Sequence, residues 1–293
     1  MKQAALLAFL QEVPFPETLR AHFFSLDSFA SNQDLFLGFA SVFTPAFPGL
    51  SPAQELLLNA AVYLGAKGIY HLDNVWDLQV AGEKRTNQAY QGQLFLLESQ
   101  RMLSQLFPFQ DDFWREYYGL LTKHFQELTL SKNIDEPLTE QAYQELLAHK
   151  YAMLYCPVNA LFSLTGKKHP SAYRTILDSL QWFCKGYNLP NEVMGLTEDL
   201  HLQINNYAYW RLQEYLLPMD IQVQDYSYED LHKMLYASEL AVTLMDEAIE
   251  ALTQAAQLVS PLELVDYQKL IYRLIDNVRQ KKEFLLPYSA NIH

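Results

Sequence analysis

Two aspartates, Asp73 and Asp77, stand four residues apart in the segment HLDNVWD, inside an otherwise apolar run. In an α-helix, residues at this spacing project from one face, so their carboxylates lie side by side. No lysine or arginine stands at a matching spacing to neutralise them. Mg²⁺ relieves such repulsion and prefers one or two carboxylates together with substrate phosphate oxygens. The pair therefore indicates either a magnesium site or a solvated helix face that carries two aspartates.

The elements around this pair are expected to be helices, because apolar residues recur at spacings of three and four along most of the chain. A break is expected at YNLPNE, and almost no alternating pattern typical of strands appears. No repeat and no low-complexity linker interrupts the pattern, so residues 1–293 are expected to form a single all-α domain, a helical bundle. The expected helices are 53–80, 87–106, 111–129, one opening at 139–140, 171–186, 191–216, 228–257 and 261–283.

The composition bounds the class of protein. The 293 residues are 50% hydrophobic and 14% aromatic with only 10 glycines, which is typical of long helices around a large apolar interior. The net charge of −13 argues against a nucleic-acid partner, since phosphate binding needs a basic face. Cys156 and Cys184 form no metal or disulfide pattern, which fits a reducing cytosol and predicts a cytoplasmic protein. No signal peptide and no transmembrane segment are expected, because no stretch of 18 apolar residues occurs.

The string D-N-x-x-D at 73–77, with the preceding YLGAKGIYHL, resembles the D-D-x-x-D motif of the class I isoprenoid synthases and the helix before it. These all-α enzymes ionise allylic diphosphates with Mg²⁺ in a central apolar cavity. The resemblance implies that Asp73 and Asp77 are metal ligands and catalytic residues at the mouth of such a cavity. Asn74 stands where the family has its middle aspartate, which is a mild change if the outer two are the main ligands.

Further segments keep the order of the family's motifs over roughly residues 30–255. Lys84 and Arg85 follow the aspartates at about the distance of the family's paired arginines. The segment from FQELTL to VNALF resembles the family's G-Q segment, loop and K-T-x-x-L helix, with Gln126 and Lys150 in the places of its glutamine and lysine. The resemblance implies that Lys84, Arg85 and Lys150 bind the diphosphate of a substrate.

The second metal motif is altered most. Where prenyl synthases have F-Q-x-x-D-D-x-x-D, residues 202–210 read LQINNYAYW, without an aspartate. One register at spacing four gives Asn206, Trp210 and Glu214, which keeps the asparagine and the glutamate of the N-x-x-x-S-x-x-x-E motif of terpene cyclases. The resemblance implies that Asn206 and Glu214 are further metal ligands.

Two other interpretations of this segment stay open. The register of Asn205, Tyr209 and Gln213 is one, and a core helix whose amides bond each other is the second. Gln203 and Asn206 also match the Q-x-x-N at the start of this helix in squalene and phytoene synthases, which implies a substrate-binding role for Gln203.

The site for a second diphosphate is absent from the sequence. Chain-elongating prenyl synthases hold isopentenyl diphosphate with a basic G-G-K-x-x-R-P string, and the corresponding residues 31–43 here contain no basic residue. Two diphosphates without that charge repel strongly where water is excluded, so ordinary chain elongation is not expected.

The favoured function is therefore a terpene-synthase-like ionisation of one prenyl diphosphate with Mg²⁺, by a diphosphate lyase or transferase. A head-to-head condensing enzyme, similar to squalene and phytoene synthases, is the first alternative. The other is a non-catalytic isoprenoid-binding or partner subunit that has lost its second metal site. The sequence leaves open the chain length of the substrate, the product skeleton and the oligomeric state, with a homodimer as one possibility.

Overall fold

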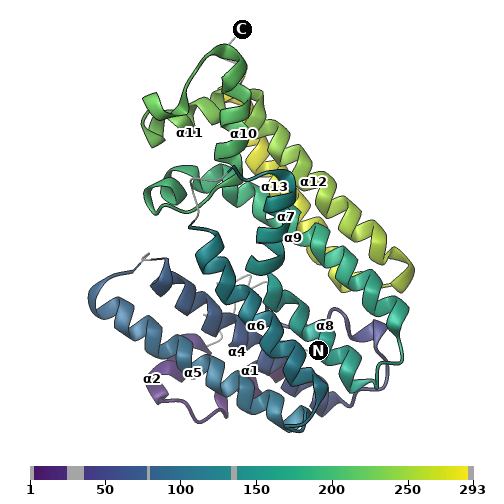
Figure 1. The fold of residues 1–293 in the computed structure, drawn as a ribbon. Coiled ribbons are helices and arrows are strands. Elements are labelled where there is room, and N and C mark those ends of the chain that lie inside the picture. Colours follow the sequence, from purple (N-terminus) through teal and green to yellow (C-terminus); the bar gives the residue numbers. More distant parts are fainter. Residues whose placement is uncertain (1–2, 25–35, 78–79, 133–136, 290–293) are drawn as a thin grey trace. The chain divides into compact units, whose positions relative to one another are not determined.

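The computed structural model describes residues 3–24, 36–77, 80–132 and 137–289, and among these it contains helices and no strand. They fall into two compact units (Figure 1). The first unit is Met1–Tyr118 with Cys156–Tyr173, and the second is Gly119–Tyr155 with Arg174–His293. The all-α fold class is therefore confirmed, while a single domain with one central cavity stays a prediction.

The first unit is built around the long helices α4 and α5, which pack side by side. The segment 31–43, which lacks the basic residues for a second diphosphate, is described only in part, because residues 31–35 lie outside the described residues. The helices of this unit are α1 (Gln3–Gln11), α2 (Glu17–Phe23), η1 (Thr44–Ala46), α4 (Pro52–Trp76), α5 (Gly82–Leu106), the beginning of α6 (Asp112–Leu130), α8 (Cys156–Leu164) and the first turn of α9 (Pro170–His201).

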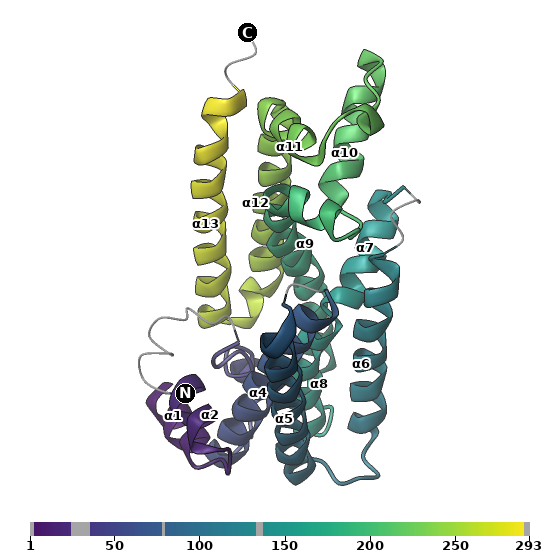
Figure 2. The same cartoon turned by 90° about the vertical axis from the view of Figure 1, so that its left-hand side faces the viewer.

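The second unit contains the antiparallel pair α12 and α13, seen side by side in Figures 1 and 2, and most of α9. None of the helices within the described ranges is both long and apolar enough to cross a membrane. Besides the rest of α6 and α9, this unit has α7 (Glu140–Lys150), η2 (Ala152–Tyr155), α10 (Tyr207–Leu216), η3 (Leu217–Met219), η4 (Val223–Asp225), α11 (Tyr228–Ala237), α12 (Glu239–Val259), η5 (Ser260–Leu262) and α13 (Val265–Ser289).

Helix α4 begins where its sequence provides caps. The Ser51 hydroxyl accepts from the Gln54 N–H, and the Gln54 side chain accepts from the Ser51 N–H at 2.9 Å, which forms a capping box. Pro52 occupies the first turn, where its fixed φ suits the helix. The predicted helix 53–80 is thus confirmed in its main part, and it carries the aspartates at its far end.

The predicted break at residues 187–192 is wrong, because α9 continues through Pro190 to His201. Pro190 is buried within this helix, and Phe183, Leu189 and Val193 are fully buried along it. Burial of large apolar side chains stabilises a helix by several kcal/mol in all, which exceeds the roughly 3 kcal/mol that an internal proline costs. Tertiary packing therefore outweighs the local signal of the proline.

The predicted helices 191–216 and 228–257 are each divided in two. Between α9 and α10 the chain turns at residues 202–206, where Gln203 has φ +54°. Between α11 and α12, Ser238 has an extended backbone with φ −79° and ψ 158°. The hydroxyl of Ser238 donates to the Leu235 carbonyl at 2.8 Å and satisfies one of the carbonyls at the end of α11.

Candidate functional site

The first candidate site lies at the end of α4. Asp73 is in the last turn of this helix, and Asp77 follows its last residue and donates its backbone N–H to the Asp73 carbonyl at 2.8 Å. Both side chains are half-buried. The last carbonyls of a helix carry negative partial charge, and the last turn of α4 contains no basic residue. Two neighbouring carboxylates at such a position would repel each other, and a bound cation would stabilise both.

Glycines fix how α5 packs against α4. An added Cβ on Gly68 would lie 2.9 Å from the Gly92 carbonyl, and one on Gly92 would lie 3.0 Å from the Gly68 carbonyl. At a neighbouring level, the Ser99 hydroxyl donates to the Ala61 carbonyl at 2.7 Å. These contacts fix an antiparallel register of the two helices. The last turn of α4 therefore lies beside the first turns of α5.

This register brings four of the predicted residues to one end of the α4–α5 pair. Lys84 and Arg85 lie in the first turn of α5, and both are exposed. The N-terminus of a helix carries positive partial charge, which adds to the charge of the two side chains. Two carboxylates that suit a metal and two cations that suit a phosphate thus share one end of the first unit.

A pocket of about 440 Å³ opens beside this end, and Lys84 is one of its lining residues. His71 also borders it, but its ring is 7% exposed and packs edge-on against Phe23 at 5.4 Å between ring centroids. This packing gives His71 a structural role in the wall. The remaining lining residues are Glu83, Asn87, Gln88 and Gln91.

Asn206 lies in the second unit and caps α10. Its side chain is fully buried, and the Oδ1 atom accepts from the Tyr209 N–H at 3.0 Å. Its Nδ2 atom donates to the Glu192 carbonyl at 3.0 Å and to Asp199 Oδ2 at 2.7 Å. These three hydrogen bonds hold the turn between α9 and α10, so the Asn206 side chain stabilises the fold at this turn.

The other residues predicted for this segment differ from Asn206 in burial and in position. Glu214 is exposed on α10, and Gln203 is exposed in the turn rather than on a helix. The indole N–H of Trp210 donates to Asn205 Oδ1 at 2.6 Å. Across the residues that the structure describes, no group of three or more histidine, cysteine or acidic side chains is arranged to hold a metal.

Lys150 ends α7 in the second unit, half-buried. Near it lies Glu192 of α9, a carboxyl group whose pKa burial raises, while the charge of Lys150 acts in the opposite direction. Burial has the largest effect, and with Asp199 it raises the pKa of Glu192 to about 7. Lys150 is therefore close enough to a buried acid of α9 to influence its charge.

Glu192 is the centre of a buried polar network in the second unit. One carboxylate oxygen accepts from Asn188 Nδ2, and the other accepts from the Tyr207 backbone N–H at 2.7 Å. Asn188 also donates to the hydroxyl of Tyr143 and accepts from that of Tyr151 at 2.7 Å. Buried polar groups need partners, and these side chains provide them for one another.

A second acid extends this network to the surface. Glu140 accepts from the Tyr207 hydroxyl at 2.6 Å and from Lys185 Nζ at 2.7 Å. Burial alone would raise the pKa of Glu140, but the hydrogen bonds from Lys185, Tyr207 and Gln144 outweigh it and lower the pKa to about 2. The rings of Tyr207 and Tyr143 stack with centroids 4.1 Å apart, which joins both acids in one assembly.

One signal in the sequence could have revealed this network. Asn188, Glu192 and Asp199 stand at spacings of four and seven, so they share a face once 170–201 is recognised as one helix. The expected break at Pro190 concealed the pattern. Tyr143, Tyr151 and Tyr207 come from distant segments and carry no local signal.

The sequence matches no family model and no curated protein. Among solved structures, a polyprenyl synthase from Roseobacter denitrificans is similar with a TM-score of 0.64 and 12% identity, over 95% of this chain and 94% of that chain. A decaprenyl diphosphate synthase from Rhodobacter capsulatus is similar with a TM-score of 0.60 and 14% identity, over 94% of each chain. At these identities the similarity concerns the fold. The resemblance to the class I isoprenoid synthases is thereby confirmed for the architecture: the chain has the all-α fold of the polyprenyl synthases.

Proposed function

We propose that the protein binds a prenyl diphosphate with Mg²⁺ and ionises it, as terpene synthases do. The observation that carries this proposal is the arrangement at one end of the α4–α5 pair. Asp73 and Asp77 stand at a helix C-terminus, and Lys84 and Arg85 stand at the adjacent helix N-terminus. In a polyprenyl-synthase fold, this combination suits a divalent cation and a diphosphate together.

The residues have distinct roles in this proposal. The donor set fits Mg²⁺, because hard carboxylate oxygens are its preferred protein ligands, so Asp73 and Asp77 would hold it. When bound, the cation would supply positive charge to the leaving diphosphate, which is where charge develops in the transition state. Lys84 and Arg85 would bind and orient the diphosphate oxygens. The substrate-binding roles of Lys150 and Gln203, which belong to the second unit, stay predictions.

The second metal set, Asn206 and Glu214, is the weaker part of the proposal. A completely buried amide with three hydrogen bonds would have to give up those bonds to reach a cation. We therefore assign the primary metal site to Asp73 and Asp77. Mg²⁺ would bind there weakly by itself and more tightly once the diphosphate brings its own oxygens.

The same observation favours a second candidate function, an isoprenoid-binding or partner subunit without turnover. A site that lacks its second metal set binds the diphosphate but stabilises its departure less. The head-to-head condensing enzyme gains no such support. Its motif pairs Gln203 with Asn206, and here one lies in a turn and the other caps a helix.

Turnover separates these candidates. The protein is incubated with Mg²⁺ and either farnesyl or geranylgeranyl diphosphate, and release of inorganic diphosphate is followed. Release with one substrate and a product of unchanged chain length supports the terpene-synthase-like function. A product of doubled length supports condensation, and binding without release supports the partner subunit. Failure to bind either diphosphate in the presence of Mg²⁺ would contradict all three.

A further inference from the structure

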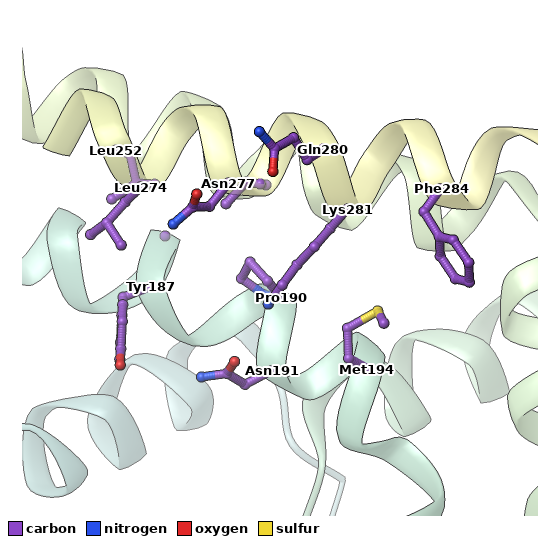
Figure 3. Close-up of a pocket in the computed structure, with 12 residues that line it drawn as sticks. Tyr187, Pro190, Asn191, Met194, Leu252, Leu274, Asn277, Gln280, Lys281 and Phe284 are labelled. Carbon is purple, nitrogen blue, oxygen red and sulfur yellow. The ribbon is translucent and has the colours of Figure 1, made fainter. Parts of the chain in front are cut away.

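A groove in the second unit lies between α9 and α13 (Figure 3). Its volume of about 640 Å³ is within the roughly 300–1,000 Å³ typical of small-molecule sites. Leu252 of α12 borders it, packed against Gly186 so closely that an added Cβ would lie 2.6 Å from the leucine Cγ. The lining residues are Gly186, Tyr187, Pro190, Asn191, Met194, Leu252, Leu274, Asn277, Val278, Gln280, Lys281 and Phe284.

The walls of the groove are mainly apolar. Pro190 and Met194 come from α9, and Leu274, Val278 and Phe284 come from α13. Phe284 is 52% exposed, which leaves a large apolar surface at one end of the groove. Such walls suit an apolar chain, because removing chain and wall from water together is favourable.

Lys281 is the cation of this groove. Its side chain extends from α13 toward Pro190 of α9 (Figure 3) and is half-buried. Burial lowers the pKa of Lys281, so its surroundings disfavour the charge. Within the described ranges, no carboxylate forms an ion pair with Lys281. The neighbouring Lys282, in contrast, binds Asp246 at 2.6 Å.

We propose that this groove binds a linear apolar chain that ends in a carboxylate or a phosphate, with the anionic head at Lys281. The apolar walls hold the chain, and the anionic head supplies the counter-charge that Lys281 lacks. This inference goes beyond the proposed function, because the lining residues include none of Asp73, Asp77, Lys84 and Arg85. The binding requires no Mg²⁺.

The direct test is isothermal titration calorimetry without Mg²⁺, using dodecyl phosphate, dodecanoate and dodecanol below their aggregation concentrations. At least one of the two anions should bind, and dodecanol should bind at least about tenfold more weakly, since it lacks the charge that a hydrogen bond from Lys281 stabilises. The anion with the higher affinity identifies the preferred head group. Decyl phosphate should bind about tenfold more weakly than dodecyl phosphate if the apolar walls hold the chain. Equal affinity for the alcohol and both anions would overturn the proposal.

Matched variants locate the binding. Lys281→Met should weaken binding of the preferred anion at least about tenfold, and Lys281→Arg should restore most of it. Lys282→Met removes the same charge one residue away and should change the affinity less than about twofold. Asn277→Trp, at an exposed position of the groove, should block the chain. Binding that survives both Lys281→Met and Asn277→Trp, or that is lost equally in Lys282→Met, contradicts the assignment.

A further variant separates this inference from the proposed function. Asp73→Asn should leave binding of the anionic chain unchanged, because the groove contains no residue of the first unit. Loss of chain binding in Lys281→Met with intact Mg²⁺-dependent diphosphate binding would support two separate sites. The folded state of each variant is checked by circular dichroism, and Lys281→Arg serves as the control that retains the positive charge.

Discussion

The carboxylate of Glu192 accepts a hydrogen bond from the backbone N–H of Tyr207 at 2.7 Å. Tyr207 is the first residue of α10, so this acid of α9 caps the N-terminus of the following helix. The favourable helix dipole and the nearby Lys150 stabilise the charge, yet burial outweighs them and raises the pKa of Glu192 to about 7. The network thus holds an acid that exchanges its proton near neutral pH.

Glu192 should make the stability depend on pH between 5 and 8. The usual pKa of 4.5 applies in the unfolded chain, and the folded pKa is about 7. In this window the folded state keeps a proton that the unfolded state has lost, so stability falls as pH rises. The upper limit of the loss is about 3 kcal/mol. Urea unfolding should therefore show that the free energy of unfolding of Glu192→Gln increases relative to that of the wild type when the pH is raised from 5 to 8.

The pH dependence has a matched control on the same helix. Glu198→Gln removes an exposed carboxylate of α9 and should change stability equally at both pH values. The low pKa of Glu140, about 2, acts only below this window, because its contribution is lost as pH falls from 4.5. An identical pH slope for Glu192→Gln and the wild type would show that Glu192 is ionised at pH 5 in the folded protein.

Asn206→Ala should destabilise the protein by about 2 kcal/mol, because it removes a helix cap and leaves buried partners unsatisfied. Urea unfolding measures this loss. The exposed Asn191 on α9 is the control, and Asn191→Ala should change stability by less than about 0.5 kcal/mol. If Asn206→Ala is stable and instead loses Mg²⁺-dependent diphosphate binding, Asn206 is a ligand.

Gly186 and Gly195 should respond oppositely to the same substitution. Gly186→Ala places a Cβ 2.7 Å from the Ala248 carbonyl and 3.0 Å from the Leu252 nitrogen, and these backbone atoms cannot move without separating α9 from α12. We expect a loss of about 2 kcal/mol or more. In Gly195→Ala the Cβ meets nothing nearer than Asp199 at 3.7 Å, so a gain of about 0.5–1 kcal/mol is expected. Equal melting temperatures for both variants would contradict the packing of α9 on α12.

Several features of the molecule were predictable because their signals are local. The apolar periodicity predicted α4 and α5, and the spacing of Asp73 and Asp77 predicted that they lie close together, which the C-terminal end of α4 confirms. The resemblance assigned Asp73, Asp77, Lys84 and Arg85 to one diphosphate site. That they share one end of a helical pair follows from the short connection between α4 and α5, which joins antiparallel helices.

The rest depends on packing that a single sequence does not record. Pro190 predicts a break by its own chemistry, and only the burial of its neighbours keeps α9 continuous. Asn206 has the right residue type for a metal ligand and also for an N-cap, and it is the N-cap because α9 ends at His201 and α10 begins at Tyr207. Glu192 accepts from Asn188 on its own helix and from Tyr207 of α10, while burial by the surrounding helices raises its pKa, so no local pattern predicts the shift.

Lys84 and Arg85 should contribute to diphosphate binding through charge. The double substitution Lys84→Met and Arg85→Met should weaken Mg²⁺-dependent binding of an inert prenyl diphosphate analogue about tenfold or more. Lys168→Met, an exposed lysine of the same unit, is the control and should have little effect. The affinity of the wild type should also fall with added salt, and the double variant should show a smaller salt dependence. An unchanged affinity would exclude these two cations from the site.

The central claim is that Asp73 and Asp77 hold Mg²⁺ for a diphosphate. The most direct measurement is calorimetric binding of an inert farnesyl diphosphate analogue with and without Mg²⁺, for the wild type, Asp73→Asn and Glu55→Gln. Glu55 is the matched control, a carboxylate in the first turn of the same helix. We predict that Mg²⁺ tightens binding in the wild type and in Glu55→Gln, and that Asp73→Asn reduces the Mg²⁺-dependent affinity at least about tenfold while its fold stays intact. Equal Mg²⁺-dependent affinity in Asp73→Asn and the wild type would contradict the claim.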